Sequence, residues 1–231
     1  MARSRQFLIF DADDTLWENN IYFEEAFDRF YEYLSHSSMS HTEVRGILDE
    51  IEMTNAKIHG YGSKNYARNL EQCYRHLAER HIAETDLQAV QEFAHQILEK
   101  PIELIDGVED TVARLSERHS LTIFTKGDQD EQRVKIDRSG LWKYFEHAAI
   151  VKEKNRAAYA NLAAEQKFDP AITWMIGNSP KSDINPALAA GLNAVFVPHA
   201  RTWNLEKTEE VPAIHPRLIR VERIRELLDH F

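Results

Sequence analysis

Apolar and polar positions follow two different patterns along this chain. Short, largely apolar runs occupy residues 7–10, 121–124, 148–151, 173–176 and 194–197. Runs of this length between polar stretches are typical of strands that are buried on both faces of a parallel sheet. The segments at about 106–118, 129–139, 155–166 and 185–190 predict helices, and residues 217–221 predict a further strand before a final helix. This alternation predicts an α/β protein with a doubly wound parallel sheet and helices on both faces.

The segment from residue 21 to about 100 has helical periodicity instead. Phe23, Phe27, Phe30 and Leu34 recur at steps of three and four residues, as expected of a helix that buries one stripe. Further helices are expected at about 42–54, 63–80 and 85–99, which together predict a small helical bundle. We therefore expect residues 1–16 and 105–231 to form the sheet domain, and residues 17–104 to form a helical cap inserted after the first strand.

Three acids follow the first apolar run at once: Asp11, Asp13 and Asp14. The carboxyl ends of strands are where open α/β sheets bind ligands. Crowded carboxylates repel one another, which predicts a divalent metal, a raised pKa, or both. In strand geometry Asp11 and Asp13 point to the same face and can divide the roles of nucleophile and proton carrier. The alternative is an Asp-rich turn whose side chains bond to nearby backbone amides.

Other strand ends carry groups suited to a transferring phosphoryl group. Thr125 supplies a hydroxyl, and the amides of Lys126 and Gly127 are candidates for an anion-binding nest. Lys154 opens a helix, where a cation is unfavourable unless an anion lies close by. An ordinary strand-to-helix turn and a solvated lysine are the alternatives, and Lys152 is a rival candidate.

The segment 177–183 adds candidate metal ligands. Asn178 offers an amide oxygen and Asp183 a carboxylate, and both types of oxygen bind hard divalent cations. The alternative is a Gly-Asn turn with a capping Asp. Each motif is weak alone, but an acid pair, a Thr, a Lys and this segment follow one another at strand ends, and that ordered set predicts a phosphotransfer site.

The net charge and the cysteine content limit the kinds of partner and site that this protein is expected to have. The net charge of −10 argues against nucleic acids and anionic membrane surfaces as partners, so an anionic substrate requires a locally positive pocket. Cys73 is the single cysteine, which excludes a disulfide framework and a thiolate metal cluster. The apolar stretch before Asp11 is too short for a signal peptide or a membrane span. We expect a cytoplasmic protein, and the sequence predicts no oligomeric state.

The ordered set resembles the haloacid dehalogenase superfamily of hydrolases. Asp11 to Thr15 resembles its first motif, Thr125 its second, Lys154 its third and residues 177–183 its fourth. The helical insert resembles the C1-type cap of that superfamily. The resemblance covers essentially the whole chain and implies a Rossmann-like doubly wound sheet with an inserted helical cap.

Two details of the motifs affect the site. Lys154 resembles the family's lysine better than Lys152 does, because Tyr159 follows it in the manner of the family's helix. Asn178 stands where the family usually has an aspartate. Either Asn178 ligates the metal through its amide oxygen or Asp183 makes the direct contact, and both remain open.

The resemblance implies a magnesium-dependent phosphatase that acts on a small phosphorylated metabolite. Asp11 would attack phosphorus and form an aspartyl-phosphate, and Asp13 would protonate the leaving oxygen and later deprotonate water. That acid role requires a raised pKa, and the acidic neighbours of Asp13 push it upward. Thr125, Lys154 and the amides of residues 126–127 would neutralise charge on the phosphoryl group. The metal would be held by Asp11, the backbone carbonyl of Asp13, and Asn178 or Asp183.

Several alternatives remain. A dehalogenase of the same superfamily releases a halide that needs no proton, so the presence of Asp13 favours phosphate. A phosphomutase, a phospho-accepting receiver domain and a non-catalytic binding protein are the others, and the insert counts against a receiver. We expect the cap to choose the substrate through the glycine-punctuated segment 55–64, with Lys57 and Tyr61 facing the active site. A plain turn between helices is the alternative for that segment.

Overall fold

The computed structural model describes residues 4–231 and divides into two compact units. One unit contains Met1–Glu18 and Ile102–Phe231, and the other contains Asn19–Pro101. The amide of Glu18 donates to the carbonyl of Glu103 at 2.9 Å, and Trp17 forms a β-bridge with Leu104. Residues 17–18 and 102–104 therefore belong to the sheet unit, whereas the sequence had assigned them to the cap.

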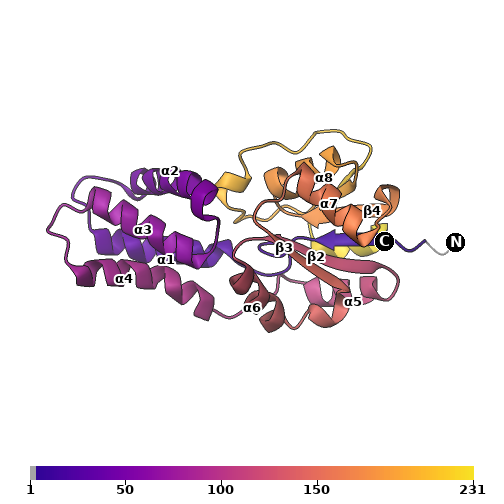
Figure 1. Cartoon of the computed structure of the whole chain (residues 1–231), viewed down its shortest axis with the longest axis horizontal. Coiled ribbons are helices and arrows are strands. Elements are labelled where there is room, and N and C mark those ends of the chain that lie inside the picture. Colours follow the sequence, from indigo (N-terminus) through magenta and orange to yellow (C-terminus); the bar gives the residue numbers. More distant parts are fainter. Residues whose placement is uncertain (1–3) are drawn as a thin grey trace. The chain divides into compact units, whose positions relative to one another are not determined.

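The larger unit is built on a parallel six-stranded sheet with the order β3-β2-β1-β4-β5-β6. Figure 1 labels the strands β2, β3 and β4. Its strands are β1 (Phe7–Phe10), β2 (Ser120–Lys126), β3 (His147–Val151), β4 (Thr173–Gly177), β5 (Asn193–Phe196) and β6 (Leu218–Arg220). All five neighbouring pairs are parallel. The strand order reverses beside β1, between β2 and β4. The carboxyl end of β1 therefore lies at the topological switch point, where sheets of this type bind ligands.

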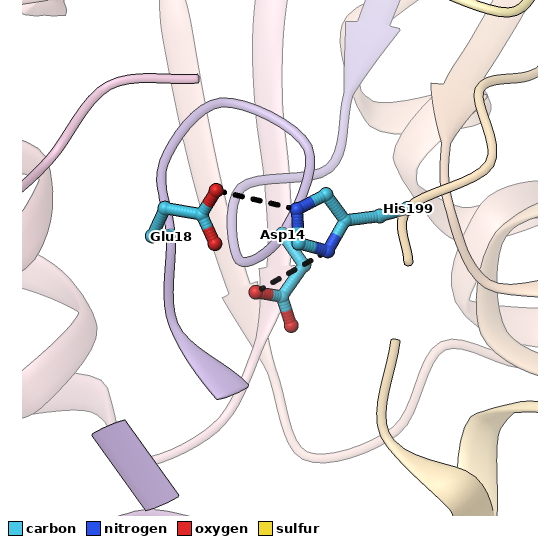
Figure 2. Close-up of side chains that lie close together, drawn as sticks. All are labelled: Asp14, Glu18 and His199. Carbon is cyan, nitrogen blue, oxygen red and sulfur yellow. Dashed lines mark hydrogen bonds and ion pairs between the residues drawn. The ribbon is translucent and has the colours of Figure 1, made fainter. Parts of the chain in front are cut away.

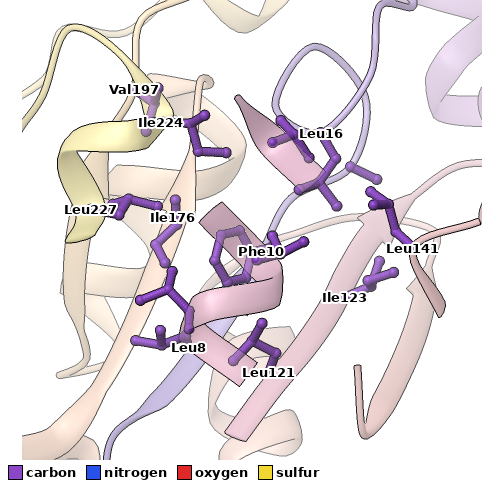
Figure 3. Packing of buried hydrophobic residues seen from close by; sticks show 14 of the residues in the cluster. Leu8, Phe10, Leu16, Leu121, Ile123, Leu141, Ile176, Val197, Ile224 and Leu227 are labelled. Carbon is purple, nitrogen blue, oxygen red and sulfur yellow. The ribbon is translucent and has the colours of Figure 1, made fainter. Parts of the chain in front are cut away.

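Helices cover both faces of this sheet, as expected. They are α5 (Val108–Ser116), α6 (Gln129–Ser139), α7 (Arg156–Gln166), α8 (Asn185–Ala189) and α9 (Leu227–His230). Leu8 and Phe10 pack on one face with side chains of α5, α6 and α9 (Figure 3). Ile9 packs on the other face with Phe124, Tyr159 and further residues of α7 and α8. Alternate residues of a strand point to opposite faces, so a run that is apolar throughout is buried on both sides.

The smaller unit is helical. It contains α1 (Asn20–Leu34), α2 (His41–His59), α3 (Ser63–Leu77) and α4 (Glu84–His95), followed by a 3-10 turn at Gln96–Glu99. Phe27 and Phe30 are fully buried and Leu34 nearly so, which confirms the stripe expected from their spacing. Across residues 4–231, none of the helices combines the length and the apolar character needed to cross a membrane.

The segment 55–64 is more regular than expected. Helix α2 continues to His59, and α3 begins at Ser63, so only residues 60–62 connect the two helices. Lys57 is exposed in the last turn of α2, and Tyr61 is half-buried in the connection. The Asn65 side chain donates to the Gly60 carbonyl at 2.7 Å and holds this connection.

Candidate active site

The chain turns sharply after β1. The strand ends at Phe10, and the amide of Asp14 donates to the carbonyl of Trp17 at 2.7 Å across the turn. Asp14 adopts a left-handed φ of 59°, which Asp tolerates better than most residues. The carboxylates of Asp11 and Asp13 bond to different partners.

Lys154 links two buried carboxylates. Its Nζ lies 2.5 Å from Oδ1 of Asp11 and 2.5 Å from Oδ1 of Asp183, and its residue is only 4% exposed. Asp11 follows β1, Lys154 follows β3 and Asp183 follows β4. Residues from the ends of three strands therefore meet here. Lys152 is exposed. The structure thus places Lys154, and not its rival, beside the first acid.

Burial governs the electrostatics of this group. Removal from water raises the pKa of Asp11 and of Asp183, and Lys154 only partly opposes that rise. Burial alone would lower the pKa of Lys154, but the two carboxylates raise it above its usual value. One ammonium group is shared by two carboxylates, so a negative charge is left over when both are ionised. A further cation would stabilise the group.

The neighbouring oxygens suit a hard divalent cation. The Thr15 hydroxyl lies 3.1 Å from Oδ2 of Asp11 and 3.2 Å from Oδ1 of Asn178. The Asn178 amide nitrogen donates to the Thr202 hydroxyl at 2.8 Å, which orients the amide oxygen toward Thr15. Carboxylate and amide oxygens are the donors that magnesium accepts. The residues present therefore fit the Mg²⁺ implied by the sequence.

Gly177 makes room for one of these ligands. A β-carbon at this position would collide with the carboxylate of Asp183. The second oxygen of Asp183 accepts the amide of Ser179 at 2.9 Å. The close approach explains why β4 ends in glycine, since any side chain there would displace the buried acid.

Asp13 is held by a separate set of donors, which we call the Asp13 cradle and define as Trp17, Gln132 and Lys135. Oδ1 accepts from Trp17 Nε1 at 2.8 Å and from Lys135 Nζ at 2.8 Å. Oδ2 accepts from Gln132 Nε2 at 2.8 Å and from Lys135 Nζ at 2.7 Å. Burial would raise the pKa of Asp13, but Lys135 and the other donors lower it below the usual value. The expectation of a raised pKa was wrong, because it considered only the acidic neighbours.

The second strand end also differs from expectation. The amide of Gly127 donates to the carbonyl of Val151 at 3.1 Å, so it is not an open donor for a phosphate. The side chain of Lys126 donates to the Ser182 hydroxyl at 2.9 Å and forms a close ion pair with Glu206. The proposed nest was wrong because β2 continues through Lys126 and keeps its neighbour in backbone pairing. Thr125 lies on β2, 1% exposed.

Glu206 completes this side of the site. Burial would raise its pKa, yet Lys126 lowers the pKa of Glu206 to about 2. Its other oxygen accepts the Ser179 hydroxyl at 2.5 Å. The glutamate therefore links the loop after β5 to the strand ends of β2 and β4.

The sequence reasoning missed Gln132, Lys135 and Glu206. Gln132 and Lys135 lie three residues apart on one face of α6. That spacing of polar side chains just after Thr125 was the available signal. No local pattern marks Glu206, because its partners lie far away along the chain.

Asp14, Glu18 and His199 gather beside the turn (Figure 2). Nδ1 of His199 lies 3.9 Å from Oδ1 of Asp14, and Nε2 lies 3.4 Å from Oε1 of Glu18. The two ring nitrogens point in different directions, so a single metal ion could be coordinated by only one of them. The geometry suits an imidazole that links two carboxylates, and thus joins the loop after β5 to the turn after β1.

Lys57 and Tyr61 belong to the helical unit, whereas Asp11 and Lys154 belong to the sheet unit. Their expected position at the substrate therefore stays a prediction.

Comparisons with known proteins identify the family of this chain. The model of the haloacid dehalogenase-like hydrolase family matches residues 7–191. The HAD-hydrolase YfnB of Bacillus subtilis is 27% identical over 139 residues, which are 58% of this chain and 57% of that protein. The chain thus spans little more than half the length of this curated relative in that match.

Solved structures extend the similarity. A haloacid dehalogenase-like family hydrolase from Xanthomonas campestris is 30% identical and has a TM-score of 0.85, with 99% of this chain and 95% of that chain covered. YfnB bound to magnesium shares the fold at 19% identity, with a TM-score of 0.70 and 99% of both chains covered. Structures with this fold include dehalogenases, a phosphatase and a phosphomutase, so the fold alone does not select the reaction. The matched family model and the parallel sheet with its acids at the switch point show that this chain belongs to the haloacid dehalogenase-like hydrolase family.

Proposed function

We propose that this protein is a magnesium-dependent phosphatase that hydrolyses a small phosphomonoester through an aspartyl-phosphate on Asp11. The observation that carries the proposal is the second carboxylate, Asp13, which is oriented by its cradle and lies close enough to influence the pKa of Asp11. A halide leaves without a proton, whereas an alkoxide leaving group needs one. A held carboxylate beside the nucleophile therefore favours phosphate esters over halo acids.

The chain's own residues account for the steps. A carboxylate oxygen of Asp11 attacks phosphorus, the new O–P bond forms, and the bond from phosphorus to the leaving oxygen breaks. Asp13 gives its proton to that oxygen, later takes a proton from water, and the hydroxide formed displaces Asp11 from phosphorus. The ammonium of Lys154 stabilises the carboxylate and the phosphoryl oxygens, and we assign the hydroxyl of Thr125 to the phosphoryl oxygens as well.

Two conditions complete the proposal. Asp11, the backbone carbonyl of Asp13, and Asn178 or Asp183 would hold Mg²⁺, which would supply positive charge to the phosphoryl oxygens. Asp13 has a lowered pKa without substrate, so its acid role requires the negative charge of the bound phosphate to raise that pKa.

We place substrate choice in the helical unit. Lys57 offers a cation and Tyr61 a ring and a hydroxyl to the leaving group. The acidic net charge of −10 makes a small phosphorylated metabolite a better partner than a nucleic acid or a membrane surface. We further propose that the protein acts in the cytoplasm.

A substrate panel tests the function. Nucleotides, sugar phosphates, phospho acids, an aryl phosphate and a 2-chloro acid are assayed with Mg²⁺ and with a chelator. We expect turnover of phosphate esters that stops without metal and falls by at least ~10³-fold in Asp11→Asn. Dehalogenation of the chloro acid, or phosphatase activity that survives Asp11→Asn, would contradict the proposal.

A further inference from the structure

The carboxylate of Asp13 is held from both sides by side chains that no motif of the sequence indicates. Lys135 Nζ lies 2.8 Å from Oδ1 and 2.7 Å from Oδ2, so it bridges both oxygens. Trp17 Nε1 holds one oxygen and Gln132 Nε2 the other, each at 2.8 Å. These four contacts restrict the rotation of the carboxylate strongly.

Gln132 is itself fixed in place. It is 4% exposed, and its Nε2 also lies 3.3 Å from the carbonyl of Lys126. A β-carbon on Gly127 would lie 2.9 Å from Nε2. Gly127 has a φ of 147°, so the missing side chain permits both this backbone conformation and the close approach of the amide. Gly127 thus serves the site by making space for Gln132.

The orientation of the Gln132 amide is a further indication that Gln132 serves Asp13. Its Oε1 is buried without a hydrogen-bond partner among residues 4–231, which is unfavourable for a buried polar atom. Turning the amide over would place that oxygen against the Asp13 carboxylate and repel it. The donor contact to Asp13 therefore decides how the amide lies.

We propose that Gln132 and Lys135 are positioning residues that hold the Asp13 carboxylate in the orientation needed for proton transfer to the leaving oxygen. The inference rests on the proposed function. Both residues project from one face of α6, a helix of eleven residues whose start is capped by Asp128, which accepts the amides of Asp130 and Glu131. A rigid helix fixes a side chain more tightly than a loop does, and proton transfer depends steeply on geometry.

A leaving-group series tests this inference. Phenyl phosphates with ring substituents of graded acidity have nearly one shape but need a proton to different degrees. The value of kcat/KM is measured for each ester and plotted against the pKa of its phenol. We expect Lys135→Met to lose ~10–100-fold on the least acidic phenol and less than ~3-fold on 4-nitrophenol, which gives a steeper slope. Lys135→Arg should restore most of the wild-type slope, because it keeps the donors.

Matched variants show whether an effect on the slope comes from the positioning of Asp13, from the loss of a charge on α6, or from a loss of protein stability. Arg133→Met removes an exposed cation from the same helix and should leave the slope unchanged. Gln132→Met removes the neutral donor and should steepen the slope in the same sense. Gln132→Met serves as the test variant if thermal unfolding shows that Lys135→Met does not fold.

A double variant shows whether Lys135 acts through Asp13. In an Asp13→Asn background, adding Lys135→Met should change the slope no further, because the group being positioned is gone. An equal loss on all esters, or additive losses in the double variant, would overturn the inference while the phosphatase assignment stands. Activity that survives Asp11→Asn would instead remove the proposed function on which the inference rests.

Discussion

Glu206 shows how a single buried side chain makes the site sensitive to pH. It is 7% exposed and pairs with Lys126, which lowers its pKa from 4.5 to about 2 against the effect of burial. A carboxyl group with a lowered folded-state pKa stabilises the native state above its unfolded pKa. That contribution is lost as the pH falls from about 4.5 toward 2.

We predict that Glu206→Gln lowers the free energy of unfolding by about 3 kcal/mol at pH 7, because Lys126 loses its buried partner. The difference from wild type should shrink as the pH falls below 4.5 and should be small near pH 2, where the carboxyl group of Glu206 is about half protonated. Urea unfolding at a series of pH values measures it. Glu210→Gln changes an exposed acid of the same segment and should match wild type; a constant difference at every pH would contradict the linkage.

At the residue scale, sequence reasoning found groups that lie at or shortly after the ends of apolar runs. Asp11 follows β1 directly and Asp183 lies in the segment after β4, and the structure brings both to Lys154. Sequence reasoning was wrong about the pKa of Asp13, because the cation that lowers this pKa is Lys135 of α6, which lies 122 positions away in the sequence. Charge repulsion between neighbours is visible in a sequence, but compensation by a distant partner is not.

At the scale of elements, the helices of the smaller unit were predicted well except at their ends. The sequence Ser40 to Glu43 forms a capping box that starts α2, in agreement with an S-x-x-E signal. The far end was underestimated, because Lys57 and His59 continue the helix up to Gly60, whose φ of 78° ends it. Helix ends depend on the cap and on packing, so periodicity alone places them poorly.

We predict that Lys57→Ala and Tyr61→Ala change which natural phosphate ester is preferred. Lys57 lies in the last turn of α2 and Tyr61 in the connection that follows it, and both are proposed to contact only the leaving group. The ratio of kcat/KM between two esters should shift by ~10-fold or more, whereas hydrolysis of a minimal aryl phosphate should stay within ~3-fold. Arg75→Ala removes an exposed cation near the far end of α3 and serves as the control. An unchanged preference in both variants would refute the role of this connection.

At the scale of the whole molecule, Mg²⁺ should stabilise the folded protein. The oxygens proposed to bind the ion come together only in the native state, and a bound cation would offset the charge left by two carboxylates on one lysine. We predict that millimolar Mg²⁺ raises the Tm of the wild-type protein by several degrees and that a chelator reverses the rise.

Asp183→Asn should lose most of that Mg²⁺-dependent rise in Tm, while Lys152→Met, an exposed position, should keep it. Differential scanning calorimetry measures both without reference to catalysis. An equal rise in Tm for wild type and Asp183→Asn would show that Mg²⁺ binds elsewhere.

The sequence by itself determined the alternation of strands and helices, the helical insert and the acids at the end of the first strand. These features are local, because the periodicity of apolar residues and the turn after a strand are properties of neighbouring positions. Only the tertiary structure decided which polar side chains meet. Lys154 pairs with Asp11, which lies 143 positions away in the sequence, and Gln132 donates to Asp13, which lies 119 positions away. The order of strands at the switch point sets those pairings, and a parallel sheet brings together strand ends that the chain keeps far apart.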